Sequence, residues 1–317
     1  MFGAYRFILA AFVALSHFGA VVAGFNPGQW AVICFYTLSG LLMERQFHKL
    51  SQHANGTAAF YLDRFLRIYP LFLVVLLLTW AGNRLSWGTA VANVTLLPMN
   101  YSSLLGIPTL IWPSWSLACE VHFYLLVPLL TFLSTRILRV ILIGSLFLFA
   151  VSPFLPQSTF WAFTGLPGIL FTFLSGILIN RKEYRFIQIL WLIMVILLVI
   201  FGLTKYLHTG LPTGIHINVT IGCLIALIST VCLDKLSPRV QWDKFLGLFS
   251  YPLFLCHELA AGFLGRHWHV RNPLVLLIGA ILLAAILIVT VEIPSDWLRY
   301  RVRRRQVPQT ESALAPR

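Results

Sequence analysis

Long apolar runs constrain the fold of this chain more than any other feature. A helix that spans a bilayer needs about 20 consecutive, mostly apolar residues. Ten runs of about this length begin near Tyr5, Gln29, Ile68, Trp115, Ile137, Thr164, Ile187, Gly214, Phe245 and Pro273. An eleventh, Leu85 to Leu105, is weaker because Asn93, Pro98 and Asn100 interrupt it. No segment alternates in polarity as strands of a membrane barrel do, so the sequence predicts an all-α, polytopic membrane helix bundle.

The composition excludes several other classes of protein. Of the 317 residues, 59% are hydrophobic and only 10% are charged, whereas an ordinary soluble domain carries about 25% charged residues. So few charges cannot cover a soluble globule, which excludes a cytoplasmic enzyme, a disordered protein and a nucleic-acid-binding domain. The formal net charge of +13 therefore bears on orientation in the membrane, because basic residues collect in cytoplasmic loops.

The distribution of basic residues predicts how often the chain crosses. If the first end is cytoplasmic and Leu85 to Leu105 does not cross, 19 of the 23 Lys and Arg residues lie inside. If that segment crosses, only eight lie inside. The positive-inside rule favours ten spans with both termini in the cytoplasm, a membrane domain over residues 1–298 and a basic tail over 299–317. The first run also has the shape of a signal peptide, but His17 within it favours a retained span.

Five cysteines are scattered through the apolar runs without a CxxC pair or a metal-ligand spacing. Cys256 lies beside His257, yet neighbouring residues on a helix point in different directions. The cysteines are therefore interpreted as small buried hydrophobes, and no metal site is predicted.

The first run carries an arginine and a histidine at a spacing that places both side chains on one helical face. Arg6 and His17 are 11 residues apart, and at about 100° per residue this separation returns to within about 20° of the same helical face. The two side chains would stand about 16 Å apart along the axis, one at the cytoplasmic end and the other deeper in the membrane. The alternative is an ordinary inner-flank arginine and a histidine bonded to a neighbouring helix.

Further polar groups stand at membrane depth, where each is costly and marks a functional candidate. Arg64 and Arg67, three residues apart, share one helical face and could clamp a phosphate-rich ligand. Their alternative role is ordinary positive charge at the inner boundary. Glu120 lies about one turn into its apolar run. Later candidates are Ser250, Tyr251, His257, Glu258, Glu292 and Pro294.

At these residues the sequence resembles the acyltransferase-3 family of integral membrane acyltransferases. The resemblance spans residues 1 to about 298, with five short motifs in the family's order. They are Arg6 with His17; Ser39-Gly40 as a turn; the loop Arg64-x-x-Arg67-Ile68-Tyr69-Pro70; Trp115-Ser116-Leu117-x-x-Glu120-x-x-Phe123-Tyr124; and Leu246-Gly247-x-x-Ser250-Tyr251 through His257, followed by Glu292-x-Pro294. The resemblance implies the same ten-span topology that the charge distribution predicts.

The resemblance implies transfer of an acyl group, usually acetyl, from cytoplasmic acyl-CoA to an acceptor across the membrane. The implied acceptor is a hydroxyl of a cell-envelope glycan or of its lipid-linked precursor, and the implied location is the bacterial cytoplasmic membrane. Acyl-CoA, most often acetyl-CoA, is the co-substrate, without a metal or a nucleic acid. Because only a basic tail follows the last run, the chain is expected to act alone, as a homo-oligomer or with a separate partner protein.

The resemblance also implies roles for individual residues. Arg6, Arg64 and Arg67 would hold the phosphates of CoA. His17 would be the general base for the acceptor hydroxyl, or would itself become acylated and relay the group. Glu120 would orient an acceptor hydroxyl from the outer side or hold an arginine. The pocket would be lined by Ser39, Trp115, Ser116, Tyr124, Ser250, Tyr251 and His257, of which the last three could equally be hydrogen bonds between helices.

Two other functions fit the same residues. Buried His, Glu and Arg side chains in a ten-span bundle could relay protons in an exporter of a lipid-linked sugar or an anion. A membrane sensor could use the basic tail, Arg299 to Arg305, to read anionic lipid. The cytoplasmic arginine motifs, placed where CoA would arrive, favour the acyltransferase.

Overall fold

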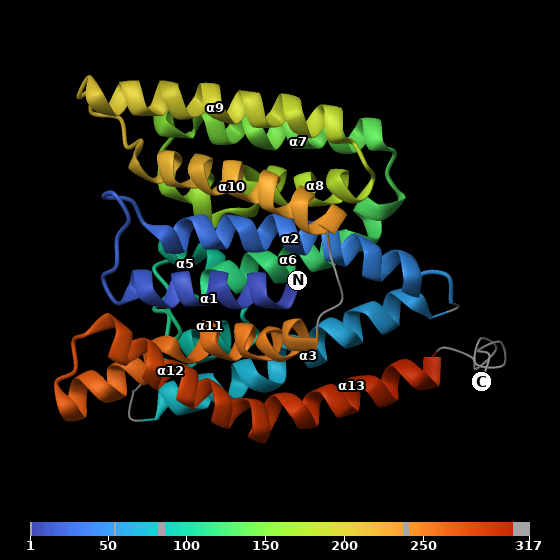
Figure 1. The fold of residues 1–317 in the computed structure, drawn as a ribbon, viewed down its shortest axis with the longest axis vertical. Helices are drawn as coiled ribbons and strands as arrows, with labels where there is room; N and C mark the ends of the chain where they lie inside the picture. Colours follow the sequence, from blue (N-terminus) through green and yellow to red (C-terminus); the bar gives the residue numbers. More distant parts are fainter. Residues whose placement is uncertain (1, 54, 82–85, 237–240, 307–317) are drawn as a thin grey trace.

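The computed structural model describes residues 2–53, 55–81, 86–236 and 241–306, which form a helical bundle with no β-strand in these ranges (Figure 1). In chain order the elements are α1 (Phe2–His17), α2 (Pro27–Leu50), α3 (Gly56–Trp80), α4 (Trp87–Thr95), η1 (Leu97–Tyr101), α5 (Ser102–Leu105), α6 (Ser114–Phe132), α7 (Thr135–Val151), η2 (Ser152–Phe154), η3 (Phe160–Thr164), α8 (Leu166–Asn180), α9 (Tyr184–Tyr206), α10 (Gly214–Leu236), α11 (Gln241–Trp268), α12 (Pro273–Leu287), η4 (Ile288–Glu292) and α13 (Ile293–Gln306). The predicted all-α fold is confirmed.

Each of the ten predicted apolar runs begins within a helical segment, although α1 and α3 end about 13 residues into their runs. Within the described residues, seven segments are long and apolar enough to cross a membrane: Ser114–Phe132, Thr135–Phe154, Phe160–Asn180, Tyr184–Tyr206, Gly214–Leu236, Trp242–Trp268 and Pro273–Arg301. The apolar helix α1 has only 16 residues. The exact number of crossings stays a prediction of the charge distribution.

The weak eleventh run does not form one helix. Over residues 86–105 it is divided into α4, η1 and α5. With nine residues, α4 is about 14 Å long at 1.5 Å per residue, roughly half the thickness of a bilayer core. Asn93 donates hydrogen bonds to the carbonyl oxygens of Thr89 and Pro108 and accepts one from the Leu110 amide, so it folds this segment back on itself.

The start of α1, the α2–α3 connection and the end of α13 lie at the same end of the bundle (Figure 1). Contacts near this end support the view: the Ala4 amide donates to Asp243 at the start of α11 (2.9 Å), and Arg299 of α13 pairs with Asp63 of α3. We call this the inner end, because the charge distribution predicts that it is cytoplasmic, and we call the opposite end the outer end.

Helices α1 and α11 run side by side in the same direction, as their paired residues show. A methyl group added at Gly3 would lie 1.8 Å from the Asp243 carbonyl oxygen, and one added at Gly247 would lie 3.1 Å from the Gly3 Cα. Farther along, the Ser250 hydroxyl donates to the Arg6 carbonyl oxygen (3.0 Å). Small residues permit this close approach of two backbones.

The expected turn at Ser39-Gly40 is wrong. Helix α2 continues through these residues to Leu50, and Gly40 serves a contact between helices instead. A Cβ at Gly40 would lie 1.9 Å from the Phe173 carbonyl oxygen of α8, and one at Gly176 of α8 would lie 1.9 Å from the Thr37 carbonyl oxygen. The two glycines therefore let α2 and α8 pack backbone against backbone.

Two other expected boundaries also differ. The segment Arg64 to Pro70 is not a loop, because α3 begins at Gly56 and continues past Pro70. The helix that follows the last apolar run passes through residue 298, the predicted domain boundary, and ends at Gln306. At the boundary Arg299 is anchored by Asp63 and Asp296. The remainder of the predicted tail, residues 307–317, lies outside the described residues.

An ion-pair network joins α2, α8 and α10 at the inner end. The buried Glu44 accepts hydrogen bonds from Arg181 (2.6 Å) and Asn180 (2.9 Å), while Asp234 pairs with Arg45 and with Lys182. The hydrogen bond to Asp234 raises the pKa of Lys182 above its usual value. Buried charges destabilise a fold unless they are paired, so these contacts retain Glu44 and Asp234 inside the bundle.

Replacing Gly40 with alanine is expected to lower the melting temperature of the purified protein, because the added methyl group collides with α8. Gly144→Ala is the matched control, since the same change in α7 meets no atom within 4 Å and improves helix propensity by about 1 kcal/mol. Fluorescence-detected size-exclusion chromatography after heating measures the melting temperatures of both variants. Equal melting temperatures for the two variants would contradict the close α2–α8 contact.

Candidate functional site

Two cavities lie one behind the other inside the bundle. The inner cavity, of about 520 Å³, is lined by residues of α1, α2, α3, α6, α11 and α13. The outer cavity, of about 490 Å³, is lined by the end of α1, the start of α2 and the segment between α4 and α6. Val32, Ser116 and Phe254 line both cavities. The two spaces therefore meet at these three side chains.

The inner cavity is cationic. Its lining includes Arg6, Arg64, Arg67, Lys244 and Arg299, against the carboxylates of Glu120, Asp243 and Asp296. The three arginines predicted from separate parts of the sequence are thus brought together. Sequence reasoning did not single out Lys244 and Arg299 for this cavity, because they resembled ordinary inner-side charge.

The arginines differ in how they are held. Arg64 pairs with Asp63, and Arg67 pairs with Glu292 at the end of η4. The guanidinium of Arg6, in contrast, makes no hydrogen bond or ion pair with any described residue, and Glu120 attracts it only through a longer-range electrostatic interaction. A paired arginine is fixed in position, whereas Arg6 keeps its hydrogen-bond donors for a ligand.

Glu120 lies in the inner cavity, not at the outer side where an acceptor would arrive. Its Oε1 accepts hydrogen bonds from the hydroxyl of Ser39 (2.9 Å) and from that of Tyr124. The Arg64 guanidinium stands over the Tyr124 ring, 5.8 Å from its centroid. Glu120 forms no ion pair with an arginine among the described residues, so both of its predicted roles, orienting an acceptor hydroxyl and holding an arginine, stay predictions.

Ser250 and Tyr251 line the same cavity and also join helices. Besides the bond from Ser250 to α1, the Tyr251 hydroxyl donates to the Ile68 carbonyl oxygen of α3 (2.7 Å). The Arg67 guanidinium lies 5.3 Å from the centroid of the Tyr251 ring. The sequence offered two interpretations of this pair, as pocket lining or as hydrogen bonds between helices. In the structure Ser250 and Tyr251 do both.

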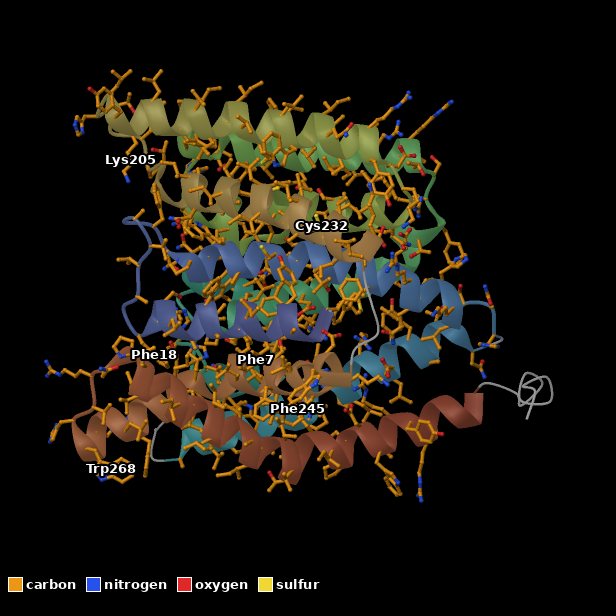
Figure 2. The ribbon with its side chains drawn as sticks, viewed as in Figure 1. Phe7, Phe18, Lys205, Cys232, Phe245 and Trp268 are labelled. Atoms are coloured by element: carbon orange, nitrogen blue, oxygen red, sulfur yellow. The ribbon has the colours of Figure 1, made fainter. Side chains whose placement is uncertain are left out.

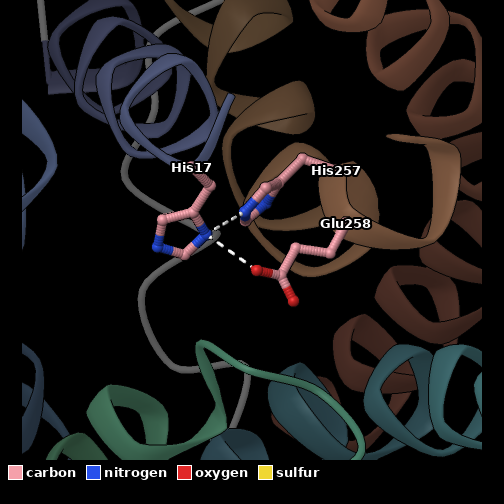
Figure 3. A group of neighbouring side chains, drawn as sticks. All are labelled: His17, His257 and Glu258. Atoms are coloured by element: carbon pink, nitrogen blue, oxygen red, sulfur yellow. Dashed lines mark hydrogen bonds and ion pairs between the residues drawn. The ribbon is translucent and has the colours of Figure 1, made fainter. Parts of the chain in front are cut away.

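His17 lies in the outer cavity, where Trp115 and Ser116 also contribute to the wall. Its ring meets two side chains of α11 (Figure 3). The Nδ1 atom is 2.8 Å from Nε2 of His257 and 3.1 Å from Oε1 of Glu258. His257 is fully buried and supports His17 from behind instead of lining either cavity.

The partners of His257 define the protonation of both rings. Its Nδ1 is 2.9 Å from the Phe254 carbonyl oxygen, and a carbonyl oxygen only accepts, so this nitrogen carries the proton. With both rings neutral, Nε2 of His257 is then an acceptor, and the proton on Nδ1 of His17 is shared between it and Oε1 of Glu258, 3.1 Å away. The remaining nitrogen of a neutral His17, Nε2, keeps its lone pair and points away from both partners (Figure 3).

The same three side chains could in principle hold a metal ion, because their ligand atoms lie within 4.8 Å of one another. Two nitrogens bound to one tetrahedral zinc ion at 2.0–2.1 Å would be about 3.4 Å apart. The two histidine nitrogens are 2.8 Å apart, which is a hydrogen-bond distance. We therefore assign this cluster as hydrogen-bonded.

From the sequence alone Glu258 was a weak candidate, although one feature of the sequence pointed to it. It is an ionisable residue within an apolar run, next to a histidine, and such a group is costly without a partner. The sequence did not reveal its partner, His17, because that residue lies about 240 positions earlier in the chain.

Comparisons with known proteins agree with the resemblance noted in the sequence. The family described as an acyltransferase domain matches residues 4–292. An uncharacterized protein of Aquifex aeolicus is 24% identical over 201 residues, which cover 61% of this chain and 90% of that relative. No solved structure matches the chain significantly.

The hydrogen-bonded cluster predicts how the protein responds to metal. Zinc at 100 times the dissociation constant of a true site would stabilise the fold by about 2.7 kcal/mol. We expect no shift in melting temperature on adding Zn²⁺ or a chelator, and no metal retained through purification. Stoichiometric zinc in the purified protein, lost in His257→Ala, would contradict the assignment.

Proposed function

Because the chain belongs to the acyltransferase-3 family, as its match over residues 4–292 shows, we propose that it transfers an acetyl group from acyl-CoA in the inner cavity to a hydroxyl group in the outer cavity. One observation carries this proposal: a cationic cavity and a cavity containing His17 meet at Val32, Ser116 and Phe254. A membrane acyltransferase of this kind needs two binding spaces that share one reaction point.

The inner cavity suits the charged end of CoA. The pyrophosphate and the 3′-phosphate need convergent cations, and charge-assisted bonds to phosphate are among the strongest hydrogen bonds in proteins. Arg6 offers unpaired donors, while Arg64 and Arg67 are held in place by carboxylates. Lys244, on the wall of the cavity, adds a point charge for a further phosphate.

The length of CoA fits the distance that it must cover. About 12 bonds separate the phosphate oxygen from the sulfur of the pantetheine arm, and an extended chain advances roughly 3.5 Å per three bonds, which gives about 14 Å. Arg6 and His17 are about 16 Å apart along α1. A phosphate bound at Arg6 therefore places the thioester near His17, once the arm passes between Val32, Ser116 and Phe254.

The chemistry follows from the protonation of His17. Its Nε2 takes the proton from the acceptor hydroxyl, and the oxygen attacks the thioester carbonyl carbon. The carbon–sulfur bond then breaks, and the CoA thiolate takes the proton back from the imidazolium. While His17 is charged, Glu258 stabilises it and His257 keeps its ring in orientation. This direct route needs no acyl-histidine intermediate.

The proposed acceptor is a glycan hydroxyl or a lipid-linked sugar that reaches the outer cavity from the far side of the membrane. We place the protein in a bacterial cytoplasmic membrane, with bilayer lipid around its apolar faces. The charge distribution supports this orientation, because it puts the cationic cavity on the side where CoA is made.

Arg6→Ala is expected to raise the dissociation constant of acetyl-CoA about 10- to 100-fold, since a hydrogen bond to a charged group contributes about 1.5–3 kcal/mol. The variant breaks no ion pair of the fold. Arg136→Ala, which removes an exposed inner-end arginine away from the cavity, is the control. Calorimetric titration measures both, and equal affinities would contradict CoA binding in the inner cavity.

His17→Ala is expected to reduce transfer about 10²- to 10⁴-fold, as the loss of a general base does, while acetyl-CoA still binds. Glu258→Gln should lower kcat by about 10- to 100-fold, because the hydrogen bond to the imidazolium loses the negative charge of its acceptor. The release of CoA from purified enzyme measures these rates, with His122→Ala as a control outside both cavities. Full turnover by His17→Ala would refute the role of this residue.

A further inference from the structure

The last helix of the bundle reaches the inner cavity from outside the region that matches the family. The match ends at residue 292, and α13 follows it. This helix packs beside α3 (Figure 1), and two of its side chains, Asp296 and Arg299, line the inner cavity. Part of the cavity wall therefore comes from a segment that carries none of the family's motifs.

Arg299 is held at the cavity by two carboxylates. Its Nε lies 3.2 Å from Oδ1 of Asp63 on α3, and its Nη1 pairs with Asp296, three residues earlier on α13. The other terminal nitrogen, Nη2, makes no hydrogen bond with any described residue. Only 12% of the side chain is exposed. A guanidinium fixed in a cavity wall with a spare donor is suited to bind an anion.

The buried Asp63 brings a second guanidinium close to the first. Its Oδ2 pairs with Arg64 and accepts a hydrogen bond from Gln46 (2.7 Å), while Oδ1 faces Arg299. Arg64 repels Arg299 electrostatically, and one carboxylate cannot neutralise both. Asp296 is the additional counter-ion, but its side chain is 38% exposed, and an ion pair that is open to water contributes little. A phosphate can therefore replace Asp296 at small cost.

The position of Arg299 along the bundle matches the second phosphate group of CoA. Arg67 is a charged neighbour of Arg6, so we place both at the level of the pyrophosphate. Asp63, which holds Arg299, precedes Arg67 by four residues in α3, and this separation puts it about 6 Å nearer the inner end. In CoA about six bonds join the 3′-phosphorus to the nearer phosphorus of the pyrophosphate, which corresponds to about 7 Å in an extended chain. The two spacings agree.

We propose that Arg299 binds the 3′-phosphate of CoA and thereby selects CoA thioesters over donors that carry only 4′-phosphopantetheine. This assignment rests on the proposed function, because it concerns the same donor site. The planar guanidinium binds a phosphate through two parallel hydrogen bonds, here from Nη1, released by Asp296, and from Nη2. A thioester of dephospho-CoA or of a carrier protein lacks the 3′-phosphate and leaves Arg299 paired with Asp296.

The first test removes the phosphate from the ligand. Calorimetric titration compares CoA with dephospho-CoA on the purified full-length protein. We expect dephospho-CoA to bind at least tenfold more weakly, because it loses charge-assisted hydrogen bonds. Equal affinities would overturn the role of Arg299 and leave the donor site intact. Binding of neither ligand would refute the proposed function, and the role of Arg299 with it.

The second test removes the guanidinium. Arg299→Ala should weaken CoA binding at least tenfold and dephospho-CoA binding less than about threefold, whereas Arg299→Lys, which keeps a point charge, should retain part of the preference. Arg139→Ala is the matched control, since it breaks the ion pair with Glu183 outside the cavity and should keep the full preference. If Arg299 only anchored α13, its loss would weaken both ligands equally, and that result would overturn the proposal.

The third test has the opposite sign and leaves Arg299 in place. Asp296→Asn removes the carboxylate that competes with the phosphate, so CoA should bind more tightly, and its affinity should rise more than that of dephospho-CoA. This variant also decides the question if Arg299→Ala proves unstable, because Asp63 still anchors Arg299 to α3. CoA binding that stays unchanged or weakens in Asp296→Asn would overturn the proposal.

Discussion

The close packing of α1 against α11 is the constraint on which the site depends. Gly3 and Gly247 let the two backbones approach at the inner end, and the parallel course of the helices then brings His17 against His257 and Glu258 near the outer end. Because α1 is rigid over its length, Arg6 and His17 keep a separation of about 16 Å. One helix pair thus places the cation Arg6 in one cavity and the imidazole of His17 in the next.

The distribution of charge gives this arrangement a direction. Side chains with formal charges surround the inner cavity, whereas His17 is the single ionisable group of the described outer wall. Two of the three residues at the junction, Val32 and Phe254, are apolar. Moving a phosphate into such a junction would be costly, while an amide arm and a thioester carry no charge. In the proposed mechanism the junction therefore admits the uncharged reactive end of acyl-CoA and excludes its phosphates. Figure 2 shows the side chains between the helices of the bundle.

The sequence predicted features that depend on local patterns. Run length indicated the helices, and the eleven-residue spacing placed Arg6 and His17 on one face of α1. It did not reveal contacts between distant residues, such as Arg67 with Glu292 or His17 with His257, which are more than 200 positions apart. Gly40 was misinterpreted for the same reason: a glycine in an apolar run resembles a turn until the α8 backbone that requires it is known.

The interrupted eleventh run shows how a weak pattern can hold functional information. Asn93 and Asn100 weakened it as a span, and both are buried in the folded chain. Asn93 uses its amide to fold the segment, whereas Asn100 lies in the wall of the cavity that contains His17. A polar residue in an apolar run therefore has three readings: a loop, a structural hydrogen bond or a binding group. Only the three-dimensional position of its amide distinguishes among them, and for Asn93 that position shows a structural hydrogen bond.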